Sequence, residues 1–306
     1  MGPRRPVSRR CGYRAGQTRS LLCLAAVLVM ILTASNIAWT PDERLAAYDL
    51  MSEAGFTGLE IAPGLFFRAA ADPFSPDPVT ARIALDEIAS RGLSLVSMQA
   101  LLFGVEGAAL LGNAAERAVF TRGMERAIDL ADRFGIPNLV FGSPGQRRIP
   151  AGMAARDAWA DATETFRSLG ERAAAAGITI AVESNPTAYG ANFLTTLEEA
   201  EAFVAQVDHP AVTLILDLGA MHLNNAFDTL PGRAEALAAR LTHVHISEPH
   251  LGPAPDDATD LTPVLLALRR GGYDRAVSIE MKRPEEGLSV LRGRLSALAR
   301  VAGTAA

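Results

Sequence analysis

Four side chains that can ligate a metal or exchange protons stand at the ends of four successive apolar segments in the second half of the chain. They are Glu183, Asp217, His245 and Glu280, each about one βα unit of roughly 30 residues from the next. Three carboxylates brought together repel one another, and a bound cation removes that conflict. Mixed carboxylate and imidazole ligation suits one divalent ion, which could be Mn2+, Co2+, Mg2+ or Zn2+. The alternative is that each residue is an ordinary polar group at a strand end, satisfied by loops or water.

The alternation of residue types predicts where these four side chains point. Within segments 178–183, 212–217, 241–247 and 276–280, the larger apolar residues share one face and the four polar residues lie on the other. In a barrel of strands, the second face is the interior. Each polar residue also lies at or near the last position of its segment, where barrel enzymes place their catalytic groups. The pattern therefore predicts that all four converge at the mouth of a barrel.

The elements that would position these residues are repeated βα units, because short β-rich segments alternate with longer amphipathic ones from residue 31 onward. Eight strands are expected at 31–38, 58–62, 93–99, 138–142, 178–183, 212–217, 241–247 and 276–281. Helices are expected at 41–54, 78–91, 114–134, 154–176, 195–207, 231–240, 260–270 and 287–300.

Eight such units match a (β/α)8 TIM barrel, which needs about 250 residues. A doubly wound open sheet is the competitor, but no glycine-rich phosphate-binding sequence follows the first strand. No linker or internal repeat divides residues 30–306. The sequence therefore predicts an α/β protein with one domain, a (β/α)8 TIM barrel.

Composition favours small-molecule chemistry over binding to a polymer. The net charge of −5 and the pI near 5.6 provide no basic surface for nucleic acid or an anionic membrane. Both cysteines, Cys11 and Cys23, precede the predicted barrel, so the barrel needs no oxidising compartment. We therefore expect a cytoplasmic protein.

The N-terminus resembles a secretory signal, because several arginines precede an apolar run at 21–32. That run is shorter than the approximately 20 residues of a transmembrane helix. Segment 31–39 also fits the first strand, and cleavage there would cut into the fold. We expect translation to begin at Met30, which makes residues 1–29 a leader or mis-assigned start outside the barrel. The alternative is a genuine signal in residues 1–33 that exports or anchors the protein.

The motifs around these strand ends resemble the xylose isomerase-like barrel superfamily. That superfamily includes ketose 3-epimerases, hydroxypyruvate isomerases, inosose dehydratases and nucleases of the endonuclease IV type. The resemblance spans about residues 31 to 300. It is carried by segments Ser35–Trp39, Gly58–Pro63, Val182–Asn185, Leu216–Gly219, His243–Glu248 and Ser278–Lys282.

The resemblance implies a metal-dependent isomerase or epimerase of a small sugar or sugar phosphate. In the ketose epimerase branch, the residues matching Glu183, Asp217, His245 and Glu280 hold one divalent ion, and the two glutamates act as acid and base. Such an ion stabilises the enediolate that forms when a proton is removed next to a carbonyl. Returning a proton on the opposite face gives epimerisation, whereas one base shuttling it between carbons gives isomerisation.

The chain departs from the ketose 3-epimerase pattern at two positions. Those enzymes carry a histidine three residues after the metal-binding aspartate, where this chain has Ala220 and the nearest histidine is His222. They also carry an arginine six residues after the metal-binding histidine, where this chain has Leu251. The sugar contacts of this chain must therefore differ from those of the ketose 3-epimerases, and its substrate is expected to differ too.

Five further residues are predicted to bind substrate. Gln99, at a strand end, could hydrogen-bond a sugar hydroxyl, although it could equally be structural, and Asn185 is expected to line the pocket. His222 could replace the missing histidine or be solvated in its loop. Lys282 could neutralise an anionic substrate or extend to the rim. Arg148, together with Arg147, could clamp a phosphate or carboxylate, or form a solvated loop pair.

Three other functions use the same predicted barrel. A dehydratase or lyase acting on a cyclitol or keto sugar would begin with the same proton abstraction. An endonuclease IV-type nuclease needs three metals and many histidines, which five histidines and an acidic chain do not favour. A sugar-binding barrel without catalysis is the last alternative. A homo-oligomer is compatible with each of them.

Overall fold

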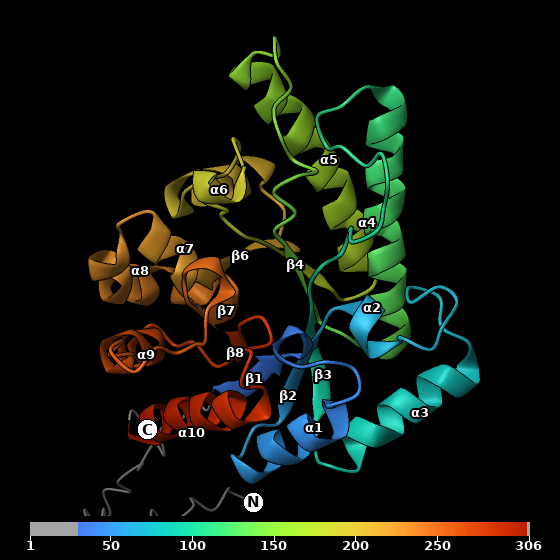
Figure 1. Ribbon diagram of the computed structural model, residues 1–306. Coiled ribbons are helices and arrows are strands. Elements are labelled where there is room, and N and C mark those ends of the chain that lie inside the picture. Colours follow the sequence, from blue (N-terminus) through green and yellow to red (C-terminus); the bar gives the residue numbers. More distant parts are fainter. Residues whose placement is uncertain (1–29, 305–306) are drawn as a thin grey trace, which may run out of the picture.

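Eight parallel strands close into a barrel in the computed structural model, which describes residues 30–304 (Figure 1). Each strand pairs with the next along the chain, and β8 pairs with β1. The strands are β1 Ile31–Ser35, β2 Gly58–Ile61, β3 Ser94–Met98, β4 Asn138–Phe141, β5 Thr179–Val182, β6 Val212–Asp217, β7 Leu241–Ser247 and β8 Ala276–Glu280. This closed ring confirms the predicted (β/α)8 barrel.

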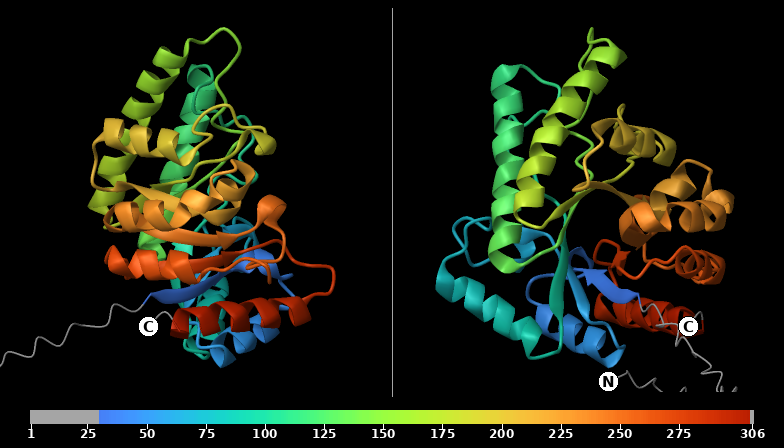
Figure 2. Two further views of the ribbon diagram at one scale, coloured as in Figure 1. Left: turned by 90° about the vertical axis from the view of Figure 1, so that its left-hand side faces the viewer. Right: turned by 180° about the vertical axis from the view of Figure 1, so that it is seen from behind.

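The helices lie outside the strands, as the views from the side and from behind show (Figure 2). They are α1 Arg44–Glu53, α2 Pro63–Phe66, α3 Pro78–Ala89, α4 Ala114–Phe134, α5 Ala155–Ala175, α6 Leu197–Val207, α7 Leu218–Leu223, α8 Leu230–Leu237, α9 Thr262–Arg270 and α10 Leu288–Thr304. Five short 3-10 helices join them, η1 Asn36–Ala38, η2 Thr187–Tyr189, η3 Phe227–Thr229, η4 Ala238–Arg240 and η5 Pro249–Leu251.

The expected elements differ from the structure mainly at their ends. β1 ends at Ser35 rather than at residue 38, because the chain turns into η1 and the Ser35 hydroxyl accepts a hydrogen bond from the Ile37 N–H. Two short helices, α2 and α7, were not predicted, since so few residues give no measurable helical periodicity. Both follow strand ends and lie beside the barrel mouth.

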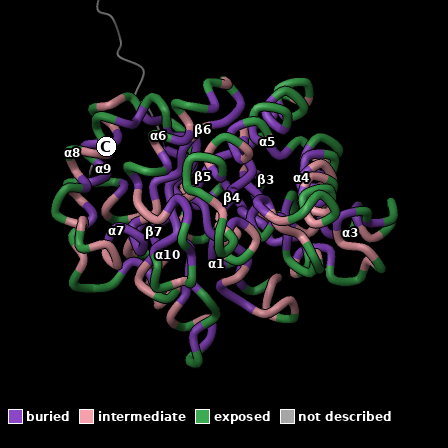
Figure 3. Tube along the Cα trace, turned by 90° about the horizontal axis from the view of Figure 1, so that it is seen from above, coloured by how far each residue is buried: buried purple, intermediate pink, exposed green. Residues whose placement is uncertain are grey.

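The apolar core lies between the strands and the surrounding helices. Seen from above, the buried strands occupy the centre and the exposed segments surround them (Figure 3). Phe166 of α5 illustrates the packing, with its ring centroid 4.8 Å from that of Phe141 in β4 and 5.3 Å from that of Phe203 in α6. Such edge-to-face contacts between large rings hold the helices against the sheet.

Strand register brings the polar strand-end residues to the same end of the barrel. Asp217 of β6 stands opposite His245 of β7, and Ser247 of β7 stands opposite Glu280 of β8. Because the strands are parallel, their carboxyl ends share one side of the barrel. The fold therefore brings together residues that lie far apart in the sequence.

The predicted leader, residues 1–29, lies outside the described residues, as do Cys11 and Cys23. Met30 is buried, and the Ile31 N–H donates to the Arg275 carbonyl, so the barrel is organised from the first described residues. Within residues 30–304, no helix is both long enough and apolar enough to cross a bilayer.

One testable contact joins the beginning of the barrel to its end. Arg283, after β8, donates two hydrogen bonds of 2.8 Å to the Glu43 carboxylate at the start of α1. These bonds, with a further one from the Thr40 N–H, lower the pKa of Glu43 from 4.5 to about 2. The stabilisation is therefore complete above pH 4.5 and is lost as the pH falls towards 2.

We expect Glu43→Gln to lower the free energy of unfolding at pH 7 by up to about 1 kcal/mol and to flatten its decline at acid pH. Urea titrations at pH 3, 5 and 7 would measure both effects. Glu53→Gln is the control, because its contact with Arg292 is exposed on both sides. Equal acid sensitivity of Glu43→Gln and the unaltered protein would contradict the expectation.

Candidate metal centre and substrate cavity

The four predicted ligands lie together, with the three carboxylates arranged around the Nδ1 nitrogen of the fourth ligand, His245. Nδ1 lies 3.3 Å from Glu183 Oε1, 3.5 Å from Asp217 Oδ2 and 3.3 Å from Glu280 Oε2. Glu183 directly follows β5, Asp217 and Glu280 end β6 and β8, and His245 lies within β7. Parallel strands of a closed barrel thus deliver one donor each to the same point.

This group can hold a divalent cation. Metal bonds of about 2.0–2.2 Å place neighbouring donor atoms roughly 3.0–3.5 Å apart, which matches the separations around Nδ1. One donor atom from each of the four side chains lies within 4.8 Å of the others. Nδ1 itself is buried without a hydrogen-bond partner. Three oxygens and one nitrogen form a mixed donor set that suits several divalent metals, and the geometry favours none of them.

Asp217 is fixed by its neighbours as well as by its strand. Its Oδ1 accepts a 2.6 Å hydrogen bond from the Ala220 N–H, so the residue also caps the amino end of α7. Its Oδ2 accepts a 2.8 Å hydrogen bond from the Ser247 hydroxyl. The Ser247 oxygen in turn accepts from the Gly219 N–H at 2.8 Å. Both Asp217 oxygens are therefore held in place before any ligand arrives.

Glu183 occupies space that a glycine leaves open. A Cβ added at Gly142 would lie 2.3 Å from Glu183 Oε2, so a larger residue would displace the carboxylate. The Asn185 amide donates a 2.8 Å hydrogen bond to the same oxygen. Asn185, predicted to bind substrate, therefore also orients Glu183.

Burial and charge shift the pKa values at this centre. Burial raises the pKa of Glu280 from 4.5 to about 7, although the neighbouring His245 acts in the opposite direction. Burial by itself would lower the pKa of His245, but the Glu280 and Glu60 carboxylates raise it well above 6.5. The centre therefore exchanges protons with its surroundings near neutral pH, and a cation that binds there competes with them.

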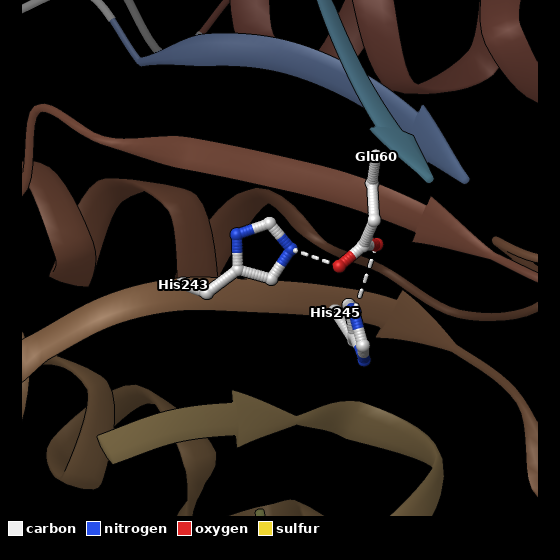
Figure 4. Close-up of side chains that lie close together, drawn as sticks. All are labelled: Glu60, His243 and His245. Carbon is white, nitrogen blue, oxygen red and sulfur yellow. Dashed lines mark hydrogen bonds and ion pairs between the residues drawn. The ribbon is translucent and has the colours of Figure 1, made fainter. Parts of the chain in front are cut away.

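A second buried cluster, formed by Glu60, His243 and His245, lies beside the four ligands (Figure 4). Glu60 Oε1 is 3.1 Å from His243 Nε2, and Oε2 is 3.0 Å from His245 Nε2. All three side chains have no solvent exposure. Burial would raise the pKa of Glu60, but the two histidines hold it well below its ordinary value.

Two adjoining cavities open at the barrel mouth. The first, about 380 Å³, is lined by Glu183, Asp217 and Glu280 together with Asn185, Tyr189 and Glu248. The second, about 280 Å³, shares Glu183 and Pro144 with the first and includes Gln99. Among residues 30–304, no lysine, arginine or histidine lines either cavity.

The five predicted substrate residues fall into two groups. Gln99 and Asn185 line the cavities, and the Gln99 amide also donates to the Ser35 hydroxyl. His222, Arg148 and Lys282 are not among the residues that line the two cavities. His222 stacks on Phe227 with ring centroids 3.7 Å apart, and Arg148 and Lys282 are exposed. His222 Nε2 also lies 3.7 Å from Oε2 of Glu248, which lines the first cavity. Substrate binding by these three residues remains a prediction.

Arg147 is not the solvated loop residue that the sequence suggested. Its side chain is fully buried and donates to the carbonyls of Glu183 at 2.7 Å and Leu194 at 3.0 Å. Burial lowers its pKa to about 10, so the side chain stays charged at neutral pH. Nothing in a single irregular loop indicates this role, and the same holds for Tyr189 and Glu248 in the cavity lining.

Comparison with known proteins agrees with this architecture. A sequence model of the xylose isomerase-like TIM barrel family matches residues 48–298. The chain is 28% identical over 217 residues to a ketose 3-epimerase from Arthrobacter globiformis, covering 68% of this chain and 70% of that protein. It is 29% identical over 175 residues to an L-ribulose 3-epimerase from Mesorhizobium japonicum, covering 55% of this chain and 57% of that protein.

A similar fold is found in the crystal structure of a 3-keto-D-glucoside 4-epimerase from E. coli. The TM-score is 0.71 at 20% identity, and the match covers 89% of this chain and 99% of that one. At this identity, the likeness concerns the fold.

Arg147 provides a test of what holds Glu183 in place. We expect Arg147→Met to lower the free energy of unfolding by about 1.5–3 kcal/mol, because two buried carbonyls lose hydrogen bonds from a charged donor. Arg148→Met, at the exposed neighbouring position, should change it by less than about 0.5 kcal/mol. Denaturant titration measures both, and equal effects would contradict the structural role of Arg147.

The raised pKa of Glu280 predicts how stability depends on pH in protein freed of metal by a chelator. The folded state binds more protons than the unfolded state between pH 4.5 and about 7, so stability falls as the pH rises through that interval. Glu280→Gln should remove this part of the decline. Urea midpoints at pH 5 and pH 8 would measure it, with Glu164→Gln, at an exposed position of α5, as the control. A decline of equal size in Glu280→Gln would contradict the assignment.

Proposed function

Because this chain belongs to the xylose isomerase-like TIM barrel family, we propose that it is an enzyme that epimerises or isomerises a small sugar. The observation that carries the proposal is the placement of Glu183 and Glu280. Each reaches within 3.3 Å of His245 Nδ1, from different strands, and both line the same cavity. Similarity to two ketose 3-epimerases supports epimerisation as the reaction.

Glu183, Asp217, His245 and Glu280 would hold one divalent ion in this proposal. Such an ion, when bound, polarises a carbonyl and makes the proton on the adjacent carbon easier to remove. Asp217, with both oxygens already hydrogen-bonded, is a ligand without freedom to move, whereas Glu183 and Glu280 also face the cavity.

The proton transfer itself belongs to the two glutamates. One carboxylate removes the proton from the carbon next to the carbonyl, and the other returns a proton to the opposite face, which inverts that carbon. The Glu280 carboxyl, with a pKa of about 7 in the metal-free centre, can hold or release a proton near neutral pH. Asn185 keeps Glu183 aimed at the cavity throughout.

The cavity lining favours a free sugar over a sugar phosphate. Four carboxylates, those of Glu183, Asp217, Glu248 and Glu280, line the first cavity, and among the described residues no cationic side chain lines it or its neighbour. Away from an ion held by Glu183, Asp217 and Glu280, a phosphate group would meet the Glu248 carboxylate and no cationic side chain of the cavity lining. Ala220 and Leu251 line the same cavity at the two positions where the sequence departs from the ketose 3-epimerase pattern. They shape a different set of sugar contacts.

We expect the unaltered protein to bind about one divalent ion per chain and to exchange the proton next to the carbonyl of a free keto sugar with solvent D2O. Glu183→Gln and Glu280→Gln should each reduce that exchange by about 100-fold or more while remaining folded. Mass spectrometry and NMR of the sugar measure exchange and inversion, and Glu164→Gln is the control.

The product distinguishes the proposal from its competitors. An epimer or isomer keeps the mass of the substrate, whereas a dehydratase product lacks one water. Retained activity in both glutamine variants, or preference for the phosphorylated form of a sugar over the free form, would contradict the respective part of the proposal.

A further inference from the structure

The cluster in Figure 4 contains a carboxylate that neither the ligand set nor the proton transfer uses. We propose that Glu60 is a positioning residue that fixes the tautomer and ring orientation of His245, so that Nδ1 presents its lone pair to the metal. The inference rests on the metal centre of the proposed function. It assigns a role to Glu60 that acts through His245, without contact with the substrate.

The first step of the argument is the identity of the proton donor. Glu60 Oε2 lies 3.0 Å from His245 Nε2 and also accepts a 2.9 Å hydrogen bond from the Ser278 hydroxyl. A carboxylate only accepts hydrogen bonds, so the shared proton must sit on His245 Nε2. Nδ1, the other nitrogen of the ring, is then the one that can offer a lone pair.

The second step is what the opposite tautomer would do. A neutral ring with its proton on Nδ1 would aim that proton into the space between Glu183, Asp217 and Glu280. That proton would occupy the place of the metal. Hydrogen bonding to the far nitrogen of a metal-bound histidine is a general means of fixing the tautomer and increasing ligand basicity.

The third step explains the second histidine. Glu60 Oε1 lies 3.1 Å from His243 Nε2 and accepts a 2.9 Å hydrogen bond from Ser97, whose oxygen accepts one from Asn138. Each Glu60 oxygen therefore has one hydroxyl and one imidazole partner. These four contacts, in a side chain with no solvent exposure, prevent rotation of the carboxylate.

The same contacts argue against a second metal between Glu60, His243 and His245, although their donor atoms lie within 4.8 Å of one another. The 3.0 Å separation between Glu60 Oε2 and His245 Nε2 is an ordinary hydrogen-bond length, and the 3.1 Å contact with His243 Nε2 is an ion-pair distance. A cation there would require His245 Nε2 to lose its proton. With Nδ1 also serving as a ligand, the ring would then be an imidazolate that bridges two metal ions. Hydrogen bonds to Ser97, Ser278 and His245, together with the ion pair to His243, engage both oxygens of the Glu60 carboxylate.

The test compares Glu60→Gln with His243→Gln in the full chain. In Glu60→Gln, one acceptor oxygen becomes an N–H donor and the negative charge behind His245 is lost. We expect the dissociation constant for Zn2+, measured by competition with a chromophoric chelator, to rise by about 10- to 100-fold. His243→Gln alters the same buried layer but leaves Glu60 and its bond to His245 in place. It should bind Zn2+ at least about tenfold more tightly than Glu60→Gln.

Nitrogen NMR of the unaltered, Zn2+-loaded protein tests the tautomer without any substitution, so it holds even if Glu60→Gln fails to fold. The His245 signal should show a proton on Nε2 that exchanges slowly with water. A proton-free Nε2, or a folded Glu60→Gln that binds Zn2+ like the unaltered protein, would overturn the inference alone. Absence of Zn2+ binding by the unaltered protein would instead overturn the proposed function, and the inference with it.

Discussion

The structure of the candidate site depends on a single imidazole ring that faces two different environments. On one side, His245 Nε2 contacts a fully buried carboxylate, and on the other, Nδ1 faces three more. Because the ring is rigid and buried at the centre of β7, its position defines where the carboxylates of β5, β6 and β8 converge. The strand register then sets the position of each carboxylate along the barrel axis, and the pairing of Asp217 with His245 places Asp217 level with the ring.

Carboxylate repulsion limits what this arrangement can be. A buried cluster of like charges persists only with protons or a cation among its members. The pKa of Glu280 is raised mainly by burial and further by the carboxylates of Glu183 and Asp217. The arrangement is therefore costly to keep for structural reasons alone. It is consistent with a site in which a bound cation balances the charge of the carboxylates.

Much of the barrel and the convergence of Glu183, Asp217, His245 and Glu280 could be predicted from the sequence, because strands alternate with a period of two and the four residues stand at matching strand ends. Residues held by irregular loops could not be predicted. Arg147 has no periodic context, and its role depends on two carbonyls brought near it by the fold. The contact of Glu60 with His245, 185 residues apart, requires closure of the barrel before it exists.

Arg147 also couples the wall of the cavity to the strand end that carries Glu183. Its guanidinium bonds the backbone of Glu183 and that of Leu194, and Tyr189 of the cavity wall lies on the segment between them. A change in that segment that moves Leu194 pulls on the strand end carrying the carboxylate. Changes of the loop that carries Tyr189 are therefore constrained by the two bonds through which Arg147 ties its ends together.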